Sequence, residues 1–183
     1  VLVTGTTARF TLLDYDSGEI LEEVEYEGLE YPRAIVNVHG DFAMIGRADE
    51  ENEPMYLLKV SDDGEEMWRK IRSDDSTRPR YAMDLILTED DGYLIFCHTS
   101  PSPSATLIKT DEDGNEEWRK KYNDNVGGGQ GWIHETDDDG YFMASGYAVT
   151  KLYEDGEVEW YAAAPSGFDK IFNNGMVSGI NHD

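Results

Sequence analysis

The sequence from residue 107 to residue 120 reads Leu107-Ile108-Lys109-Thr110-Asp111-Glu112-Asp113-Gly114-Asn115-Glu116-Glu117-Trp118-Arg119-Lys120. It contains a short apolar run, an acidic turn that ends in Asp-Gly, and a tryptophan four residues after the glycine. Similar stretches occupy residues 57–70 and 150–160, and a weaker copy without the tryptophan occupies residues 12–21. Asp-Gly between apolar runs predicts a hairpin, because glycine tolerates the positive φ that a tight turn requires. The residues that mark this first motif are Gly18, Gly64, Trp68, Gly114, Trp118, Gly156 and Trp160.

A second motif alternates with the first. It reads Asp90-Asp91-Gly92-Tyr93-Leu94-Ile95-Phe96-Cys97 and returns as Asp138-Asp139-Gly140-Tyr141-Phe142-Met143-Ala144, with looser copies at residues 39–46 and 173–177. The glycines of the first motif are 46, 50 and 42 residues apart, and Gly40, Gly92 and Gly140 of the second are 52 and 48 residues apart. Two interleaved series with nearly the same period indicate a repeated structural unit of about 46 residues.

Each period of the repeat contains four candidate strands. In the third unit the first two strands are predicted at residues 131–135 and 141–145, and in the second unit the last two are predicted at residues 106–110 and 117–121. The unbroken apolar run from Tyr93 to Cys97 is typical of a strand buried on both faces, whereas the tryptophan strand mixes polar and apolar residues and is expected to be half-exposed. Four antiparallel strands per repeat is the pattern of a β-propeller blade. We therefore predict an all-β fold, a β-propeller with four-stranded antiparallel blades.

The repeat divides the chain into about four blades. We place the units at residues 31–74, 80–123 and 131–163, with partial units at 1–28 and 166–183, all within one propeller domain or propeller fragment that covers residues 1–183. In the partial units we expect strands at 1–7, 9–14, 20–26, 169–173 and 176–180. The two ends would then supply the same strand of a blade twice. Three arrangements remain open: part of a ring of six to eight blades, a closed four-bladed ring with one displaced strand, and an open arc that a second chain completes, since unpaired strand edges need a cover.

The composition excludes several classes of function. The chain has 183 residues with 39 acidic and 15 basic side chains, a formal net charge of −24 and a pI of about 4.2. Such a surface repels nucleic acids and anionic membranes, and no apolar run approaches the roughly 20 residues of a membrane helix. One cysteine makes no internal disulfide and no cysteine-rich zinc site. Much of the charge lies in the repeated turns, and this acid-rich, lysine-poor composition is of the halophilic type, in which salt screens self-repulsion.

The repeat unit resembles secreted bacterial and archaeal β-propeller repeats that read roughly DGGYILAGYTS…WLIKTDSNGNEQW. The resemblance covers nearly the whole chain and is clearest from Tyr56 to Trp160. It implies an extracellular or cell-surface protein, and it carries no general catalytic signature. The Gly-to-Trp spacing also matches the docking pattern of propeller repeats like those of pyrroloquinoline-quinone enzymes, in which the tryptophan packs between blades. The sialidase Asp-box has a shorter Gly-to-aromatic spacing and matches poorly.

Residues 135–140 are the strongest metal candidate. Glu135, Asp137 and Asp139 lie at alternate positions before Gly140, and calcium prefers several hard oxygen ligands in such a loop. The corresponding loop that ends at Gly92 lacks the first acid, and no distant glutamate completes an EF-hand. A solvated hairpin turn is therefore the preferred interpretation, with calcium as the alternative and no other cofactor expected.

The other candidate residues favour structural roles. His134 lies on an inner strand, and the four histidines form no metal-binding pair. Cys97 lies in an apolar strand and is expected to be a small buried hydrophobe. The tryptophans recur at the blade period, which favours packing over ligand stacking. The basic residues after them, around Arg69 and Arg119, are expected to pair with nearby glutamates at little gain in stability.

These observations favour a non-catalytic binding or scaffold module of a secreted or cell-surface protein, whose partner is a protein, a glycan or another copy of itself. We expect the binding residues in the loops 48–54, 73–78, 100–104 and 122–131, because these loops vary most among the repeats. The alternatives are a propeller enzyme, quinone-dependent or glycoside-directed, and a structural subunit of an extracellular assembly. We do not predict an enzyme, because no convincing catalytic set is present.

Overall fold

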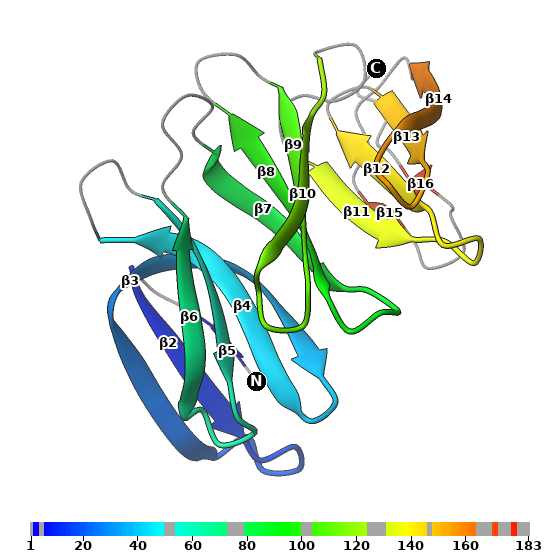
Figure 1. Cartoon of the computed structure of the whole chain (residues 1–183). Coiled ribbons are helices and arrows are strands. Elements are labelled where there is room, and N and C mark those ends of the chain that lie inside the picture. The colour runs from blue at the N-terminus through cyan, green and yellow to red at the C-terminus, as the bar shows by residue number, and fades with distance from the viewer. Residues whose placement is uncertain are drawn as a thin grey trace, which may run out of the picture. The chain divides into compact units, whose positions relative to one another are not determined.

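The computed structural model describes residues 2–3, 6–49, 54–72, 79–99, 104–123, 131–145, 148–163, 170–171 and 177–178. These residues form strands and turns and no α-helix, and none of them belongs to a helix that could cross a membrane. The chain divides into two compact units, residues 1–85 and 86–183. The strands are β1 (Leu2–Val3), β2 (Thr7–Leu13), β3 (Ile20–Val38), β4 (Asp41–Ala48), β5 (Met55–Val60), β6 (Glu66–Arg72), β7 (Pro79–Leu87), β8 (Tyr93–Thr99), β9 (Ala105–Thr110), β10 (Glu116–Lys121), β11 (Gly131–Glu135), β12 (Tyr141–Ser145), β13 (Ala148–Leu152), β14 (Val158–Ala163), β15 (Lys170–Ile171) and β16 (Val177–Ser178), shown in Figure 1.

Two repeat units form one four-stranded sheet each. The strand order is β10-β9-β8-β7 in the first of these sheets and β11-β12-β13-β14 in the second. Sequential strands pair antiparallel, as β12 does with both β11 and β13. The predicted strands at residues 131–135 and 141–145 have the bounds of β11 and β12. The predicted all-β fold of four-stranded antiparallel blades is confirmed.

The apolar strands are buried and the tryptophan strands are more exposed, as the sequence predicts. The apolar stretch Tyr93–Cys97 of β8 is fully buried, and so is nearly all of β9. The tryptophan strand β10 is half-buried at its centre and exposed at both ends. β14, the corresponding strand of the last described blade, is exposed along its whole length.

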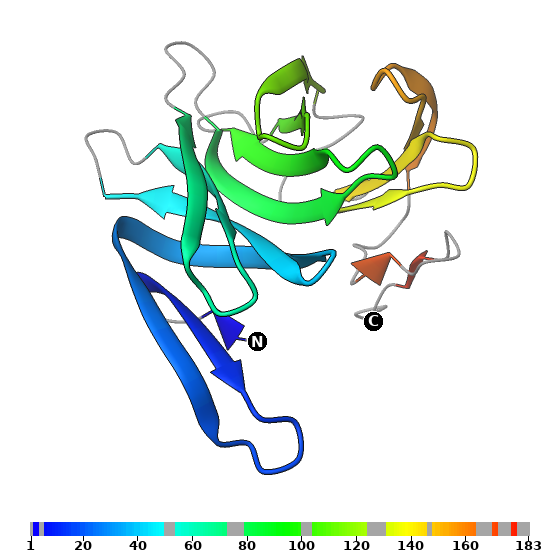
Figure 2. The ribbon, with the colours of Figure 1, turned by 60° about the horizontal axis from the view of Figure 1, so that its bottom comes forward.

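The first six strands form one continuous sheet, in the order β1-β2-β3-β4-β5-β6. The sequence predicts a strand at 20–26 and another from about residue 31, but β3 is a single strand of 19 residues that pairs first with β2 and then with β4. Gly28 and Tyr31 have φ angles of 75° and 45°, which bend the strand where it changes partner. Figure 2 shows the β2–β3 hairpin extending away from β4–β6. The core of this sheet includes Phe10, Tyr26 and Tyr56.

The last two strands, β15 and β16, pair antiparallel within the ranges predicted for the C-terminal strands, and β15 lies beside β11. The loops predicted to carry the binding residues fall largely on residues 50–53, 73–78, 100–103 and 124–130, which lie outside the described residues. Their predicted role stays a prediction.

Candidate functional site

The Asp-Gly turns of the first motif all use glycine in the predicted conformation. Gly64, Gly114 and Gly156 have φ angles of 89°, 74° and 79°. In each turn the glycine N–H donates to the carbonyl three residues earlier, for example from Gly114 to Asp111 at 3.0 Å. The three glycines are buried although the acidic residues that precede them are exposed. Other residues of the fold must therefore cover each glycine.

The preceding blade covers Gly156. A Cβ atom at this position would lie 2.9 Å from the ring of Trp118, which also packs on Tyr141 with 6.3 Å between ring centroids. The Tyr122 hydroxyl donates to the Gly156 carbonyl at 2.7 Å, and the Lys120 ammonium lies 2.5 Å from the Glu157 carboxylate. Burial raises the pKa of Tyr122, so its hydroxyl remains a donor. Trp118 therefore packs on Gly156 and Tyr141 of the following blade.

An equivalent contact covers Gly64 in the first unit. A Cβ atom there would lie 2.7 Å from the ring of Phe10 and 3.2 Å from the Val24 side chain. The Tyr26 hydroxyl donates to the Gly64 carbonyl at 2.8 Å, as Tyr122 does to Gly156. Both tyrosines stand eight residues after a motif glycine, so this spacing in the sequence was the signal that could have identified them.

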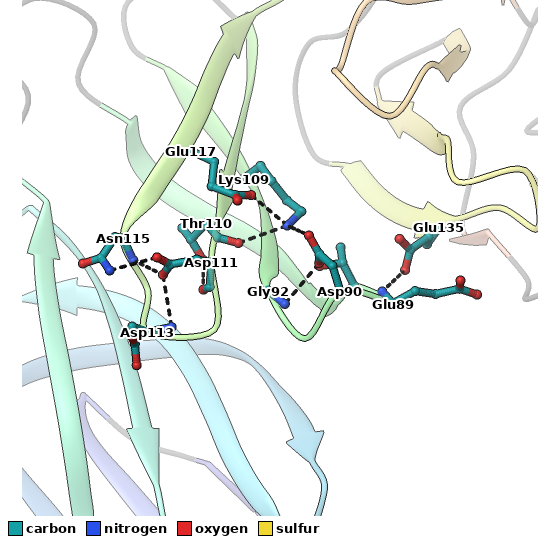
Figure 3. Close-up of polar contacts among 11 residues, drawn as sticks. Glu89, Asp90, Gly92, Lys109, Thr110, Asp111, Asp113, Asn115, Glu117 and Glu135 are labelled. Carbon is teal, nitrogen blue, oxygen red and sulfur yellow. Dashed lines mark hydrogen bonds and ion pairs between the residues drawn. The ribbon is translucent and has the colours of Figure 1, made fainter.

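The second motif forms its own turn around a buried lysine (Figure 3). The Lys109 side chain is 4% exposed, and its ammonium donates to Asp90 at 2.7 Å and to Glu117 at 3.1 Å. Burial acts to raise the pKa of Asp90, but hydrogen bonds from Lys109, Thr88 and the Gly92 N–H outweigh it and lower that pKa. A Cβ atom at Gly92 would lie 2.6 Å from the Lys109 ammonium, so glycine makes room for the ion pair.

The same arrangement recurs in the next blade. The Lys151 side chain is 8% exposed, and its ammonium donates to Asp138 at 2.6 Å and to the Thr136 hydroxyl at 2.7 Å. These hydrogen bonds from Lys151 and Thr136 lower the pKa of Asp138 to about 2. Sequence reasoning missed both lysines, because each lies on a strand 13 or 19 residues away from its aspartate, which lies in a turn.

The three calcium candidates do not converge in the structure. Glu135 ends β11 and accepts the Glu89 N–H at 2.9 Å, while burial raises the pKa of Glu135. Asp137 and Asp139 lie in the turn on either side of Asp138, which holds Lys151. Among the described residues, no three His, Cys, Asp or Glu side chains are placed to share a metal ion. Calcium binding itself stays a prediction.

The remaining predicted residues lie in structural surroundings. Cys97 is fully buried, as expected for a small hydrophobe. Arg119 pairs with Glu116 at 2.7 Å, and Arg69 pairs with Glu66 in the same way. His134 is half-buried on β11.

Trp68 and Trp160 take the place of Trp118 in their own blades. Each pairs across the hairpin with a lysine, Trp68 with Lys59 and Trp160 with Lys151. Trp68 is half-buried, whereas Trp160 is 45% exposed. Trp160 contacts Phe142 of its own blade edge-on, with 5.8 Å between ring centroids. A packing role within the blade is therefore shown for Trp160.

An open pocket lies over the turns of the β11–β14 blade. Its volume is about 740 Å³. Its lining is acidic apart from one lysine, one glycine and one aromatic side chain, Tyr153, which is 54% exposed. The polar groups that line the pocket are Asp138, Asp139, Lys151, Glu154, Asp155, Glu157 and Glu159. The pocket can therefore offer several carboxylates and one aromatic ring to a ligand.

Comparison with known proteins supports the fold alone. No protein family and no curated protein sequence matches the chain. A protein of unknown function from Bacteroides caccae is similar in structure, with a TM-score of 0.62 and 12% identity over 94% of this chain and 62% of that one. A europium-containing methanol dehydrogenase is also similar, with a TM-score of 0.58 and 11% identity over 91% of this chain and 42% of that one. The chain thus spans less than two thirds of either protein, and it has the fold of β-propeller blades.

Proposed function

We propose that the chain is a non-catalytic β-propeller module that binds a glycan or protein partner in a secreted or cell-surface protein. The proposal is supported by one observation above all, the open acidic pocket over the turns of the β11–β14 blade. The repeated polar residues near it serve the fold, because Lys151 and Asp138 hold the turn together. Glu157 pairs with Lys120, and the pocket lining also includes Asp139, Glu154 and Glu159, whose carboxylates we propose for ligand binding.

The chemistry of the pocket favours a ligand with many hydroxyl or amino groups. Carboxylates accept hydrogen bonds from such groups, and an exposed tyrosine offers an apolar face with a polar tip. The Tyr153 ring and the Glu159 carboxylate both line the pocket. A neutral or amino-substituted glycan and a basic peptide segment meet these requirements, whereas an anionic ligand does not. Glycan binding is the form of the proposal that we test first.

The test is a glycan array, followed by calorimetric titration of the best neutral and amino-substituted glycans against the whole chain. We expect Tyr153→Ala and Glu159→Gln each to weaken binding by about ten-fold, the loss that accompanies removal of a central contact. Tyr15→Ala is the matched control, because Tyr15 is a fully exposed tyrosine in a different turn. Binding that survives both pocket variants, or no binding of any glycan or basic peptide, would contradict the proposal.

An enzyme on the same blades is the alternative, quinone-dependent or glycoside-directed. Glycoside hydrolysis needs a pair of carboxylates on either side of the scissile bond, and the pocket contains several carboxylates. Release of reducing sugar from a bound glycan, abolished by single glutamate substitutions in the pocket, would favour this alternative. Binding without turnover favours the module.

The extracellular location and the halophilic character are part of the proposal. The chain carries a formal net charge of −24, so its carboxylates repel one another, and salt screens that repulsion. The melting temperature should therefore rise when NaCl is added. An unchanged melting temperature would argue against adaptation to a salty medium.

A further inference from the structure

A second pocket lies between β10 and the β13–β14 hairpin, and we call it the basic pocket. Its volume is about 450 Å³, and its lining belongs entirely to the described part of the second unit. Most of the lining comes from the end of β10 and the two residues that follow it, and the rest comes from the hairpin. The lining residues are Arg119, Lys120, Lys121, Tyr122, Asn123, Gly156, Glu157 and Val158. The basic pocket adjoins the acidic one, because Glu157 lines both.

The charge of the basic pocket is opposite to that of the chain. Three cationic side chains and one carboxylate line it, whereas the whole chain has 15 basic and 39 acidic side chains. The Lys120 ammonium pairs with Glu157 at 2.5 Å, and the Arg119 guanidinium pairs with Glu116 at 2.7 Å. Lys121 is exposed at the end of β10, and within the described residues no hydrogen bond or ion pair reaches its side chain. The Lys121 ammonium can therefore accept an anion as its partner.

The three consecutive basic residues are specific to this blade. They stand five to seven residues after the motif glycine, Gly114. The other copies of the motif have different residues at these positions, namely Glu23-Val24-Glu25, Arg69-Lys70-Ile71 and Tyr161-Ala162-Ala163. Variation among copies of one structural unit is expected where function, rather than packing, sets the residues. The fold of the blade therefore does not explain why a third cation is present at Lys121.

The walls of the basic pocket are held by the contact between two blades. The Tyr122 hydroxyl donates to the Gly156 carbonyl at 2.7 Å, and a Cβ atom at Gly156 would lie 2.9 Å from the Trp118 ring. Tyr122 and Gly156 are both buried, so this contact does not depend on the charged side chains at the rim. A site whose backbone is already fixed loses less conformational freedom when it binds a ligand.

We propose that the basic pocket binds the carboxylate of an acidic sugar, such as a uronic acid residue of a glycan. Lys121 pairs with this carboxylate, and Lys120 exchanges its pairing with Glu157 for the same group. The Asn123 amide, which can both donate and accept hydrogen bonds, also lines the pocket and suits the hydroxyl groups of a sugar. A single anionic group is favoured over a polyanion, because the net charge of −24 repels a polyanion as a whole.

A carboxylate site goes beyond the proposed function, because the acidic pocket does not suit an anionic group. Lys121 lines the basic pocket and not the acidic one, so its variants test the basic pocket alone. Neutral glycans that bind while acidic sugars do not would contradict the carboxylate site and leave the proposed function intact. Acidic sugars that bind while neutral and amino-substituted glycans do not would have the opposite meaning.

The experiment is a titration of the whole 183-residue chain with sodium glucuronate at constant ionic strength, followed by two-dimensional NMR of the backbone amides. Glucose is the neutral control, and acetate supplies a carboxylate without the sugar. We expect saturable shifts at residues 119–123 and 156–158 with glucuronate, no such shifts with glucose, and several-fold weaker binding of acetate. Glucose shifts equal to those of glucuronate, acetate binding of equal strength, or tighter binding of a glutamate-containing peptide would overturn the proposal.

Two substitutions with opposite expected effects separate binding from folding. Lys121→Gln removes the ammonium without a partner and should raise the dissociation constant of glucuronate about ten-fold. Glu157→Gln removes the carboxylate that pairs with Lys120 and should lower that constant about three-fold. Lys70→Gln is the matched control, because Lys70 stands at the position of Lys120 on β6 of the first unit, and it should leave the constant unchanged. A constant that Lys121→Gln does not change, or that Glu157→Gln raises, would overturn the proposal.

Discussion

The turns at residues 88–92 and 136–140 have the same backbone layout, but the buried lysines beside them have different hydrogen-bond partners. Lys109 donates to two carboxylates, those of Asp90 and Glu117, and to the Thr110 carbonyl at 3.1 Å. Lys151 donates to one carboxylate, that of Asp138, and to the Thr136 hydroxyl. Its ammonium also lies 5.6 Å from the centroid of the Phe142 ring.

The difference comes from two equivalent positions of the repeat. Glu117 and Glu159 both stand three residues after a motif glycine, but Glu117 reaches its lysine whereas Glu159 lines the open pocket. Leu94 and Phe142 both stand opposite these lysines, and only the aromatic ring offers a π face to the ammonium. In one blade Glu117 therefore takes part in the ion pair with the lysine. In the other blade Glu159 lines the pocket and is available to a ligand. The backbone plan of the repeat is therefore separate from the surface that it displays.

Alanine at Gly92 or Gly140 should have the largest effect, and about the same effect in both turns. The new Cβ atom would lie 2.2 Å from the Thr110 carbonyl oxygen in one turn and 2.4 Å from the Leu152 carbonyl oxygen in the other. Both atoms belong to the backbone and cannot move aside. We expect the free energy of unfolding to fall by about 3 kcal/mol in each variant, measured by urea denaturation.

Gly18→Ala is the control for these variants. Gly18 also lies in a turn, but its surroundings are open, so alanine adds only the strain of a positive φ, about 1 kcal/mol. A loss at Gly92 no greater than that at Gly18 would show that the space beside the lysine is not tight.

Asparagine at Asp90 and at Asp138 should separate the two turns. Both changes leave a buried ammonium without its aspartate, but Lys109 keeps Glu117, whereas no second carboxylate among the described residues pairs with Lys151. We expect Asp90→Asn to lower the free energy of unfolding by about 1 kcal/mol, because Asp90 is itself largely exposed to solvent. The loss from Asp138→Asn should be larger. Equal losses in parallel urea titrations would contradict the difference drawn between the turns.

Most of the strand pattern could be predicted because the repeat places a glycine at each hairpin. The bounds of β11 and β12 follow from Gly131 at one end and Gly140 before the other strand. The continuous β3 could not be predicted, because Tyr31 bends the strand at a positive φ that a non-glycine residue seldom adopts. Local sequence therefore located the turns more reliably than the places where a strand changes partner.

The candidate site was harder to predict than the strands. The acidic turn at 135–140 was visible, but Lys151, which neutralises Asp138, lies two strands along the chain. The role of Lys151 depends on the register between β12 and β13, which sets Phe142 opposite Lys151. The composition of the chain does not determine that register. The pocket depends in turn on the direction in which Glu159 points, which packing decides.

The pH dependence of stability should show how much the Asp138 carboxylate contributes to the stability of its turn. Hydrogen bonds from Lys151 and Thr136 lower the pKa of Asp138 from 3.8 to about 2. A carboxylate whose pKa is lower in the folded state stabilises the fold fully above its unfolded pKa and loses that contribution as the pH falls through the folded value. The melting temperatures of the unchanged chain and of Asp138→Asn should therefore differ most above about pH 4 and converge towards pH 2.

Asp139→Asn provides the matched control for the pH experiment. Asp139 is the next residue and has a φ of 61°, which asparagine tolerates. Its carboxylate lies outside the ion pair with Lys151, so the melting temperature of this variant should run parallel to that of the unchanged chain. If the melting temperatures of both variants differ from that of the unchanged chain above pH 4 and converge with it towards pH 2, the net charge of the turn is responsible rather than the Asp138–Lys151 pair.

Glutamine at Glu117 and at Glu159 should give the smallest effects, and effects of opposite sign. Glu117→Gln removes a partly exposed ion pair with Lys109, which lowers the free energy of unfolding by about 0.5 kcal/mol. Glu159→Gln removes one negative charge from an acidic pocket and should raise stability slightly, because like charges repel there. Urea denaturation at low salt measures both changes, and added NaCl should shrink them. Two losses of equal size would show that Glu159 serves its lysine as Glu117 does, and the pocket would then be part of the fold's own ion pairing instead of a surface left open to a ligand.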